Sequence, residues 1–133
     1  MPTGFSNKRI YWLNHQGIEV LVVNFSGATA RESLELIDDF NAILKDHKAG
    51  TVRMFTDVTD AQYDPAIANK WKAVRLQQGA KIHASVVVGL SGLVGVAVRS
   101  FFELGRFLNL PKSRLKMKIF ANRDQALAWL IKA

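Results

Sequence analysis

The sequence predicts an α/β domain with a mostly parallel β-sheet, and three observations lead to that fold class. Short runs rich in Val, Ile and Phe alternate with segments of helical periodicity. The runs at 20–25 and 84–90 are nearly continuously apolar, as expected of strands that are buried on both faces. Only the first two runs are separated by a short turn, so the later strands are expected to be joined by helical crossovers and to run parallel.

The expected order of elements is β-β-α-β-α-β-α-β-α, and we expect it to form one domain over the whole chain. Strands at Ile10–Asn14 and Glu19–Phe25 form an antiparallel hairpin in which Gly17 takes a positive φ. Thr29 and Glu32 have the spacing of a capping box, and the helix that they begin runs to about residue 46.

The next strand is expected at Val52–Val58, and Asp64 followed by Pro65 begins a second helix as its N-cap and first residue. The inner stripe of that helix consists of three apolar residues, Ile67, Trp71 and Val74. Its basic residues are expected to face solvent: Lys70, Lys72 and Arg75.

The second half of the chain adds two strands and two helices. After the strand at Ala84–Leu90 comes a glycine-rich turn, in which Ser91 is expected to cap a long apolar helix. A last strand at Lys116–Phe120 precedes a short helix that begins at Asn122, with Gln125 three residues further on.

Charge and composition narrow the class of protein. The net charge of +7 is uneven, because residues 1–66 carry 6 Lys/Arg and 9 Asp/Glu whereas residues 67–133 carry 12 and 2. A basic half attracts phosphates, acidic proteins or an anionic membrane, or else forms a solvated surface. The longest uncharged run has 17 residues, between Lys81 and Arg99, and a membrane span needs about 20. Without cysteine or an apolar signal segment, we expect a cytoplasmic protein.

The chain resembles the SpoIIAA-like family, which is related to the STAS fold and is grouped by some with CRAL-TRIO lipid-carrier domains. The resemblance rests on the order and spacing of Gly17-Ile18-Glu19-Val20, Phe25-Ser26-Gly27, Thr56-Asp57-Val58-Thr59, Tyr63-Asp64-Pro65, Val88-Gly89-Leu90-Ser91-Gly92-Leu93, Ile119-Phe120 and Ala126-Leu127-Ala128-Trp129-Leu130. It implies a largely parallel sheet with packed helices, and a non-catalytic role in regulation or ligand binding.

One departure from the STAS pattern bears on regulation. STAS anti-sigma antagonists carry a phosphorylatable serine at the start of the helix after the third strand. This chain has Asp64-Pro65-Ala66 at that place, without a hydroxyl, and Thr59 lies in a different part of the loop. We therefore do not expect partner switching controlled by phosphorylation.

The helix expected after Ser91 is more apolar than a helix with one buried face requires. Arg99 and Arg106 share a narrow charged arc, and Phe102 and Phe107 flank it. The additional apolar surface of this helix favours an apolar-ligand pocket, a subunit interface or docking at an anionic membrane surface. Alternatively, neighbouring helices cover the flanks of the charged arc. The candidate ligand- or membrane-binding residues are Gly89, Ser91, Gly92, Arg99, Phe101, Phe102, Arg106 and Phe107.

The loop at the carboxyl end of the third strand is a second candidate site, because open α/β sheets bind ligands at that edge. Its candidate residues are Asp57, Thr59 and Asp64. A capped, solvated loop explains the same residues, and turn geometry explains the glycines after Val88. The three histidines have no paired ligand spacing, so we expect no metal site.

These observations lead to three hypotheses about function. The first is a non-enzymatic cytoplasmic SpoIIAA-like domain, peripheral at the inner membrane surface if it docks there. It is expected to form a homodimer and to bind a small apolar ligand, a lipid or an anionic membrane surface, with no cofactor and no specific nucleic acid. The second is a STAS-type protein-interaction module that lacks the phosphoacceptor serine. The third is an enzyme that uses the loop from Asp57 to Asp64.

Overall fold

A five-stranded sheet forms the centre of the part of the chain that the computed structural model describes, residues 8–62, 64–89 and 116–133. The strands are β1 (Ile10–His15), β2 (Ile18–Asn24), β3 (Val52–Asp57), β4 (Ile82–Val88) and β5 (Lys116–Phe120), in that spatial order. Strand β1 is antiparallel to β2, and all the other pairs are parallel. The expected fold class is confirmed.

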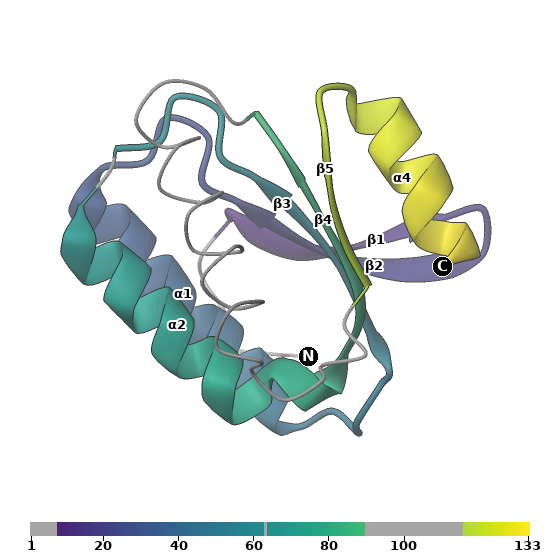
Figure 1. The fold of residues 1–133 in the computed structure, drawn as a ribbon, viewed down its shortest axis with the longest axis horizontal. Coiled ribbons are helices and arrows are strands. Elements are labelled where there is room, and N and C mark those ends of the chain that lie inside the picture. Colours follow the sequence, from purple (N-terminus) through teal and green to yellow (C-terminus); the bar gives the residue numbers. More distant parts are fainter. Residues whose placement is uncertain (1–7, 63, 90–115) are drawn as a thin grey trace.

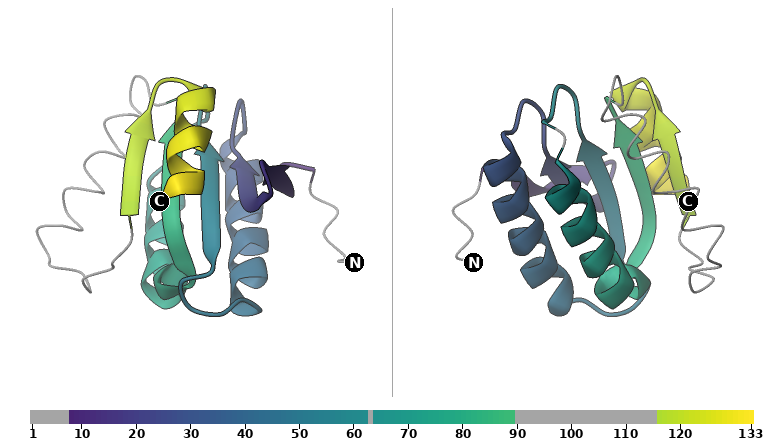
Figure 2. Two further views of the ribbon diagram at one scale, coloured as in Figure 1. Left: turned by 90° about the vertical axis from the view of Figure 1, so that its right-hand side faces the viewer. Right: turned by 60° about the vertical axis from the view of Figure 1, so that its left-hand side comes forward.

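Helices cover both faces of this sheet (Figure 1). Helices α1 (Ala30–Lys45) and α2 (Pro65–Gln78) lie side by side on one face, and α4 (Arg123–Lys132) lies on the other (Figure 2). Right-handed crossovers that add successive strands in one direction place α1 and α2 on the same face. None of the described helices combines the length and the hydropathy that a membrane span requires.

The turn between β1 and β2 has the geometry of a type I′ hairpin. Gly17 has a φ of +86°, which confirms the expectation from the sequence, and Gln16 also has a positive φ, +52°. His15 pairs with Ile18 next to this turn, and the pairing continues to Ile10 and Val23. The tight turn fixes the register, and hence which face of the sheet each side chain occupies.

The helix starts follow the capping pattern in the sequence. The Thr29 hydroxyl accepts from the Glu32 amide at 3.2 Å, and the Glu32 carboxylate accepts from the Thr29 amide at 3.0 Å, which completes the expected capping box of α1. The bond from the Thr29 amide is the main cause that lowers the pKa of Glu32. Asp64 caps α2 as expected, because its carboxylate accepts from the Ala66 amide at 2.7 Å.

The central strands bury side chains on both faces. Leu21 and Val23 of β2 pack into the cluster under α1 and α2, whereas Val20 and Val22 pack into the cluster under α4. All four are at most 1% exposed. Two separate hydrophobic cores therefore share one sheet, which explains the nearly unbroken apolar run in the sequence.

Several strand limits differ from those expected. Strand β4 begins two residues earlier than the expected Ala84 and ends at Val88, because Gly89 leaves the extended conformation with a φ of +83°. Strand β3 ends at Asp57, one residue early. The helix expected after Ser91 lies outside the described residues.

Candidate functional site

The carboxyl edge of the sheet brings together three of the residues singled out from the sequence, Asp57, Thr59 and Gly89. The Thr59 amide and hydroxyl both donate to the Asp57 carboxylate, at 2.9 and 2.6 Å. A Cβ atom on Gly89 would collide with the Thr59 hydroxyl and lie 2.6 Å from the Thr59 amide nitrogen. Glycine at position 89 thus permits a close approach of two loops.

Backbone bonds hold the same loops to the end of β2. The Gly27 amide donates to the Thr59 carbonyl at 2.8 Å, and the Gln62 amide donates to the Ala28 carbonyl at 3.0 Å. Asp64 is engaged separately, as the N-cap of α2. The polar groups of this edge mainly satisfy one another, which favours the interpretation of the loop as a capped structural turn.

The other candidate residues from the sequence lie outside the described part of the chain. They are Ser91, Gly92, Arg99, Phe101, Phe102, Arg106 and Phe107. Their roles stay predictions.

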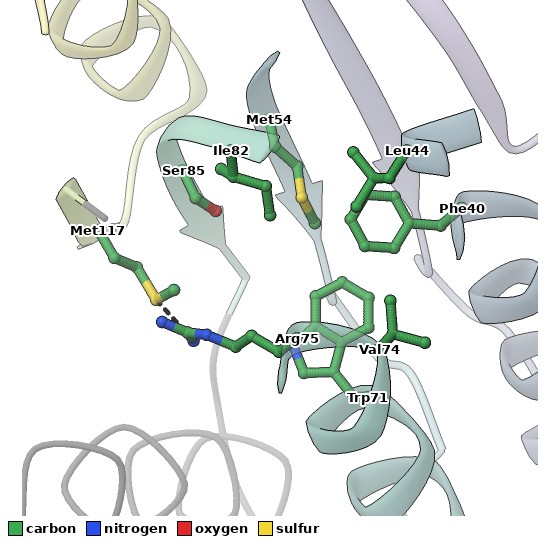
Figure 3. A pocket seen from close by; sticks show the side chains of 9 residues that line it. All are labelled: Phe40, Leu44, Met54, Trp71, Val74, Arg75, Ile82, Ser85 and Met117. Carbon is green, nitrogen blue, oxygen red and sulfur yellow. Dashed lines mark hydrogen bonds between the residues drawn. The ribbon is translucent and has the colours of Figure 1, made fainter. Parts of the chain in front are cut away.

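A small apolar pocket lies between α1, α2 and the sheet (Figure 3). It leaves a space of about 20 Å³, room for one water-sized molecule. Its described lining consists of Phe40, Leu44, Met54, Trp71, Val74, Arg75, Ile82, Ser85 and Met117. We call it the α2 pocket.

An aromatic wall and two thioethers give the α2 pocket its character. Trp71 stacks on Phe40 with ring centroids 5.2 Å apart, and it meets Phe25 edge-on at 5.8 Å. This ring cluster fixes one wall. Met54 of β3 and Met117 of β5 contribute the flexible side chains on the sheet side. Methionine adapts its shape readily, so this wall can adjust to an occupant.

Arg75 corrects an expectation from the sequence, because its side chain is half-buried and not fully exposed to solvent. Its guanidinium reaches from α2 towards β5, where Nη1 lies 3.5 Å from the Met117 sulfur (Figure 3). Burial lowers the pKa of Arg75 to about 10. Lys70, by contrast, does lie on the outside of α2, where its ammonium is 2.7 Å from the Asp38 carboxylate.

Two hydroxyl side chains lie on the same face of the sheet as the pocket. Ser85 of β4 lines it and is 3% exposed. Thr56 follows Met54 by two residues in β3, so it shares that face, and its buried hydroxyl oxygen has no hydrogen-bond partner within the described structure. This region of the core is more polar than the alternation of apolar residues in the strands suggests.

Comparison with known proteins bears on the fold. Neither a protein-family model nor a curated protein matches the sequence. A solved structure of an uncharacterised protein from the DUF3478 family of Shewanella loihica PV-4, described as having a SpoIIAA-like fold, matches with a TM-score of 0.69 and 19% sequence identity over 98% of each chain. The chain has a SpoIIAA-like fold.

Within the described part of this SpoIIAA-like fold, the titratable residues do not gather into a metal centre. The described residues contain no group of three or more His, Asp or Glu side chains placed to hold a metal ion. The His47 ring packs at a tilt against Trp12, with ring centroids 5.2 Å apart, and a ring nitrogen of His83 lies 2.9 Å from the Ala133 carbonyl oxygen, so these two histidines have structural contacts.

Sequence reasoning missed the α2 pocket for an identifiable reason. Arg75 follows Trp71 by four residues in α2. Residues with this spacing lie on the same side of a helix, so helical periodicity by itself would have indicated that Arg75 lies near the inner stripe. Its charge suggested an exposed position instead. Met54, Ser85 and Met117 come from three different strands, and no local pattern brings them together.

The contact between Gly89 and Thr59 predicts that Gly89→Ala is unusually destabilising. Gly50→Ala is the matched control, because Gly50 has a similar φ of +72° and a Cβ atom added there would have nothing within 4 Å. We expect Gly50→Ala to lower the free energy of unfolding by about 1 kcal/mol, from backbone strain alone. Gly89→Ala adds a steric clash and is expected to cost about 2 to 4 kcal/mol.

Urea unfolding of the two variants measures this difference. Equal losses for Gly89→Ala and Gly50→Ala would show that the loops at the carboxyl edge do not pack as closely as described.

Proposed function

We propose that this protein is a non-catalytic binding domain and that its ligand is a small apolar molecule held in the α2 pocket. The observation that carries the proposal is the lining: of the nine lining side chains that the structure describes, seven are apolar, and they come from two helices and three strands. Ligand sites are typically apolar cavities with a few polar groups between packed elements.

The ligand must enlarge the space that the pocket now offers. About 20 Å³ accommodates one water-sized molecule, so an occupant must displace neighbouring side chains. Met54 and Met117 are suited to this, since an unbranched thioether changes rotamer without a large loss of packing. Trp71 is held by its stacking on Phe40 and supplies the fixed surface.

A lipid is one natural source of such a ligand. The proposal also extends to docking at an anionic membrane surface from the cytoplasm, and this extension rests on the sequence alone. Its residues, including Arg99, Phe102 and Arg106, lie outside the described part of the chain. The α2 pocket is the part of the proposal that described residues support.

The proposal predicts saturable binding of 1-octanol, an uncharged apolar probe. Burial of about seven methylene groups at about 0.8 kcal/mol each corresponds to a Kd on the order of 10⁻⁴ M. Isothermal titration calorimetry measures the Kd. Fluorescence of Trp71, recorded in a Trp12→Phe, Trp129→Phe background, reports whether the probe reaches the pocket wall.

A matched pair of α2 variants locates the binding. Val74→Phe fills the pocket, because Val74 is 5% exposed and lines it, and this variant is expected to lose octanol binding. Ala73→Phe adds a similar volume on the exposed side of the helix and is expected to bind normally. Absence of saturable binding to the parent protein, or equal binding by a folded Val74→Phe variant, would contradict the proposal.

A protein-interaction role is the second proposal, and the β1 edge favours it. Strand β1 is at the end of the described sheet and carries two exposed aromatic side chains, Tyr11 at 40% and Trp12 at 41%. The Asn24 amide donates to the Arg9 carbonyl, so these two residues form a hydrogen-bonded pair of the antiparallel ladder. Such pairs alternate along a strand with pairs that are not hydrogen-bonded, so the backbone N–H and C=O of Trp12 point away from β2. Charged residues or proline usually protect such edges, and Ile10–Asn14 contains neither.

Antiparallel pairing of β1 with the same strand of a second chain is the homodimer that this edge predicts. Sedimentation equilibrium is expected to show a dimer for the parent protein and a monomer for Trp12→Lys, because a charge on the edge opposes pairing. Leu76→Lys is the control, because Leu76 is 52% exposed on α2, and this variant is expected to leave the dimer intact. A monomeric parent protein would contradict the homodimer.

A further inference from the structure

We infer that two copies of this chain join edge to edge through β1 in one particular register, in which Trp12 lies opposite the partner's Trp12 and the two sheets become continuous. The inference rests on the proposed homodimer, because it assigns how the two copies pair at the same edge. It depends on a further observation, however: which residues of β1 turn their backbone groups away from β2.

The even-numbered residues of β1 are the ones available for pairing with another strand. The Arg9 carbonyl accepts from the Asn24 amide at 2.8 Å, so the hydrogen-bonded residues in the ladder with β2 are the odd-numbered ones. The backbone N–H and C=O groups of Ile10, Trp12 and Asn14 therefore point away from β2. Because β1 is an end strand of the described sheet, these groups form a row of donors and acceptors that fits a further strand.

A second copy of β1 suits this edge better than the opposite end of the sheet does. Strand β5 is the other end strand of the described sheet, and two of its five residues are lysines, which usually protect an edge. Pairing of β1 with β5 would also be head-to-tail, an arrangement that continues into a ring or a filament. Antiparallel pairing of β1 with itself closes with two copies.

Charge favours the same antiparallel orientation. Lys8 is exposed just before β1, and Glu19 is exposed next to its other end, where it pairs with Asn14. Antiparallel pairing brings the first end of one strand to the second end of the other, so opposite charges approach each other twice in the dimer.

A register centred on Trp12 uses every residue of β1 that has outward groups. In an antiparallel ladder, outward groups on one strand bond only to outward groups on the other. With Trp12 opposite the partner's Trp12, Ile10 lies opposite the partner's Asn14, and Asn14 lies opposite the partner's Ile10. All three residues then form hydrogen-bonded pairs, and the paired segment coincides with the strand that the structure shows.

The two neighbouring symmetric registers use less of the strand. A two-fold axis at Leu13 would place Ile10 opposite Gln16, which has a φ of +52° in the hairpin turn and does not continue the strand. An axis at Tyr11 would place Asn14 opposite a residue that precedes β1. Each of these registers leaves one end of the strand without a regular pair, so the Trp12-centred register is favoured.

The favoured register also pairs the exposed aromatic side chains. Tyr11 and Trp12 are two of the three large apolar side chains that are exposed among the described residues. The two Trp12 rings would lie side by side on the α1 face, where His47 already packs against the ring with centroids 5.2 Å apart. On the other face, Tyr11 would meet the partner's Leu13, which is only partly buried. Such cross-strand pairs stabilise antiparallel sheets.

Paired cysteine variants test the register, because the parent chain contains no cysteine. In the Trp12-centred register, Tyr11 and the partner's Leu13 are directly opposite, at a separation that a disulfide spans. Two copies of Tyr11→Cys, or two of Leu13→Cys, are diagonal neighbours about 7 to 8 Å apart, beyond the usual range of a disulfide. The two variants are mixed in equal amounts while reduced and then treated with oxidised glutathione.

The disulfide between one chain of each variant is expected to exceed either symmetric disulfide at least about tenfold, because only that pair has the required geometry. Intact mass spectrometry separates the three products, since the two variant chains differ in mass. Sedimentation equilibrium and thermal unfolding of each reduced variant check that it is a folded dimer. Leu76→Cys, on the exposed side of α2, is mixed with Tyr11→Cys as the control for random collision and is expected to form little disulfide.

Amide hydrogen exchange of the parent protein, measured by NMR, is a second test that needs no cysteine variant. The amides of Ile10, Trp12 and Asn14 are expected to exchange at least about tenfold more slowly than the same positions in the Trp12→Lys monomer. The amides of Tyr11 and Leu13 bond to β2 in both states and serve as the internal reference. Fast exchange at Ile10 or Asn14 in a dimeric parent protein would contradict the register.

The outcomes separate the register from the homodimer itself. A monomeric parent protein would overturn the homodimer and the register together. A dimer in which a symmetric disulfide dominates would overturn the register and leave edge pairing through β1 in place. A dimer whose Tyr11→Cys and Leu13→Cys chains form no more disulfide than the Leu76→Cys control would overturn pairing through β1 altogether.

Discussion

The burial of the central sheet on both faces is the constraint on which the rest of the structure depends. Strands β2 to β4 carry apolar side chains above and below the sheet, so each face requires a cover. The right-handed crossovers supply α1 and α2 to one face, and α4 covers β3, β4 and β5 on the other. Arg53 of β3 helps to hold α4 in place by donating to the Leu130 and Ala133 carbonyls, at 3.2 and 3.3 Å.

The α2 pocket follows from how α2 meets this sheet. Val74 is buried against the sheet, and its neighbour Arg75 reaches from the edge of the same contact towards β5. On the sheet side, the lining includes Met54, Ser85 and Met117. Branched aliphatic side chains at these positions would fill the space more completely.

Much of the fold could be predicted because its signals are local. The Gly17 turn, the Thr29 capping box and the Asp64 cap each depend on residues a few positions apart, and the structure confirms all three. The two-sided burial of β2 could be predicted from an unbroken apolar run. The exact strand ends could not, because they depend on contacts such as that of Gly89 with Thr59, between loops 30 residues apart.

The candidate site was harder to predict, because it is assembled across the fold. Asp57, Thr59 and Gly89 were expected at one edge and do meet there, but their mutual bonds favour a structural role. The pocket needs Met54, Ser85 and Met117 from three strands to face one helix, which requires the sheet order. We expected Arg75 on the exposed side of α2 because it is charged, although its spacing of four residues from Trp71 indicates the same side as that ring.

The ε-methyl groups of the methionines test the central claim, a ligand in the α2 pocket, most directly. Met54 and Met117, two of the chain's three methionines, both line the pocket. In methyl NMR spectra recorded during a titration with 1-octanol, the account predicts that the Met54 and Met117 signals shift together and saturate with one Kd. Unchanged Met54 and Met117 signals at 1-octanol concentrations that saturate binding, or shifts that never saturate, would contradict it.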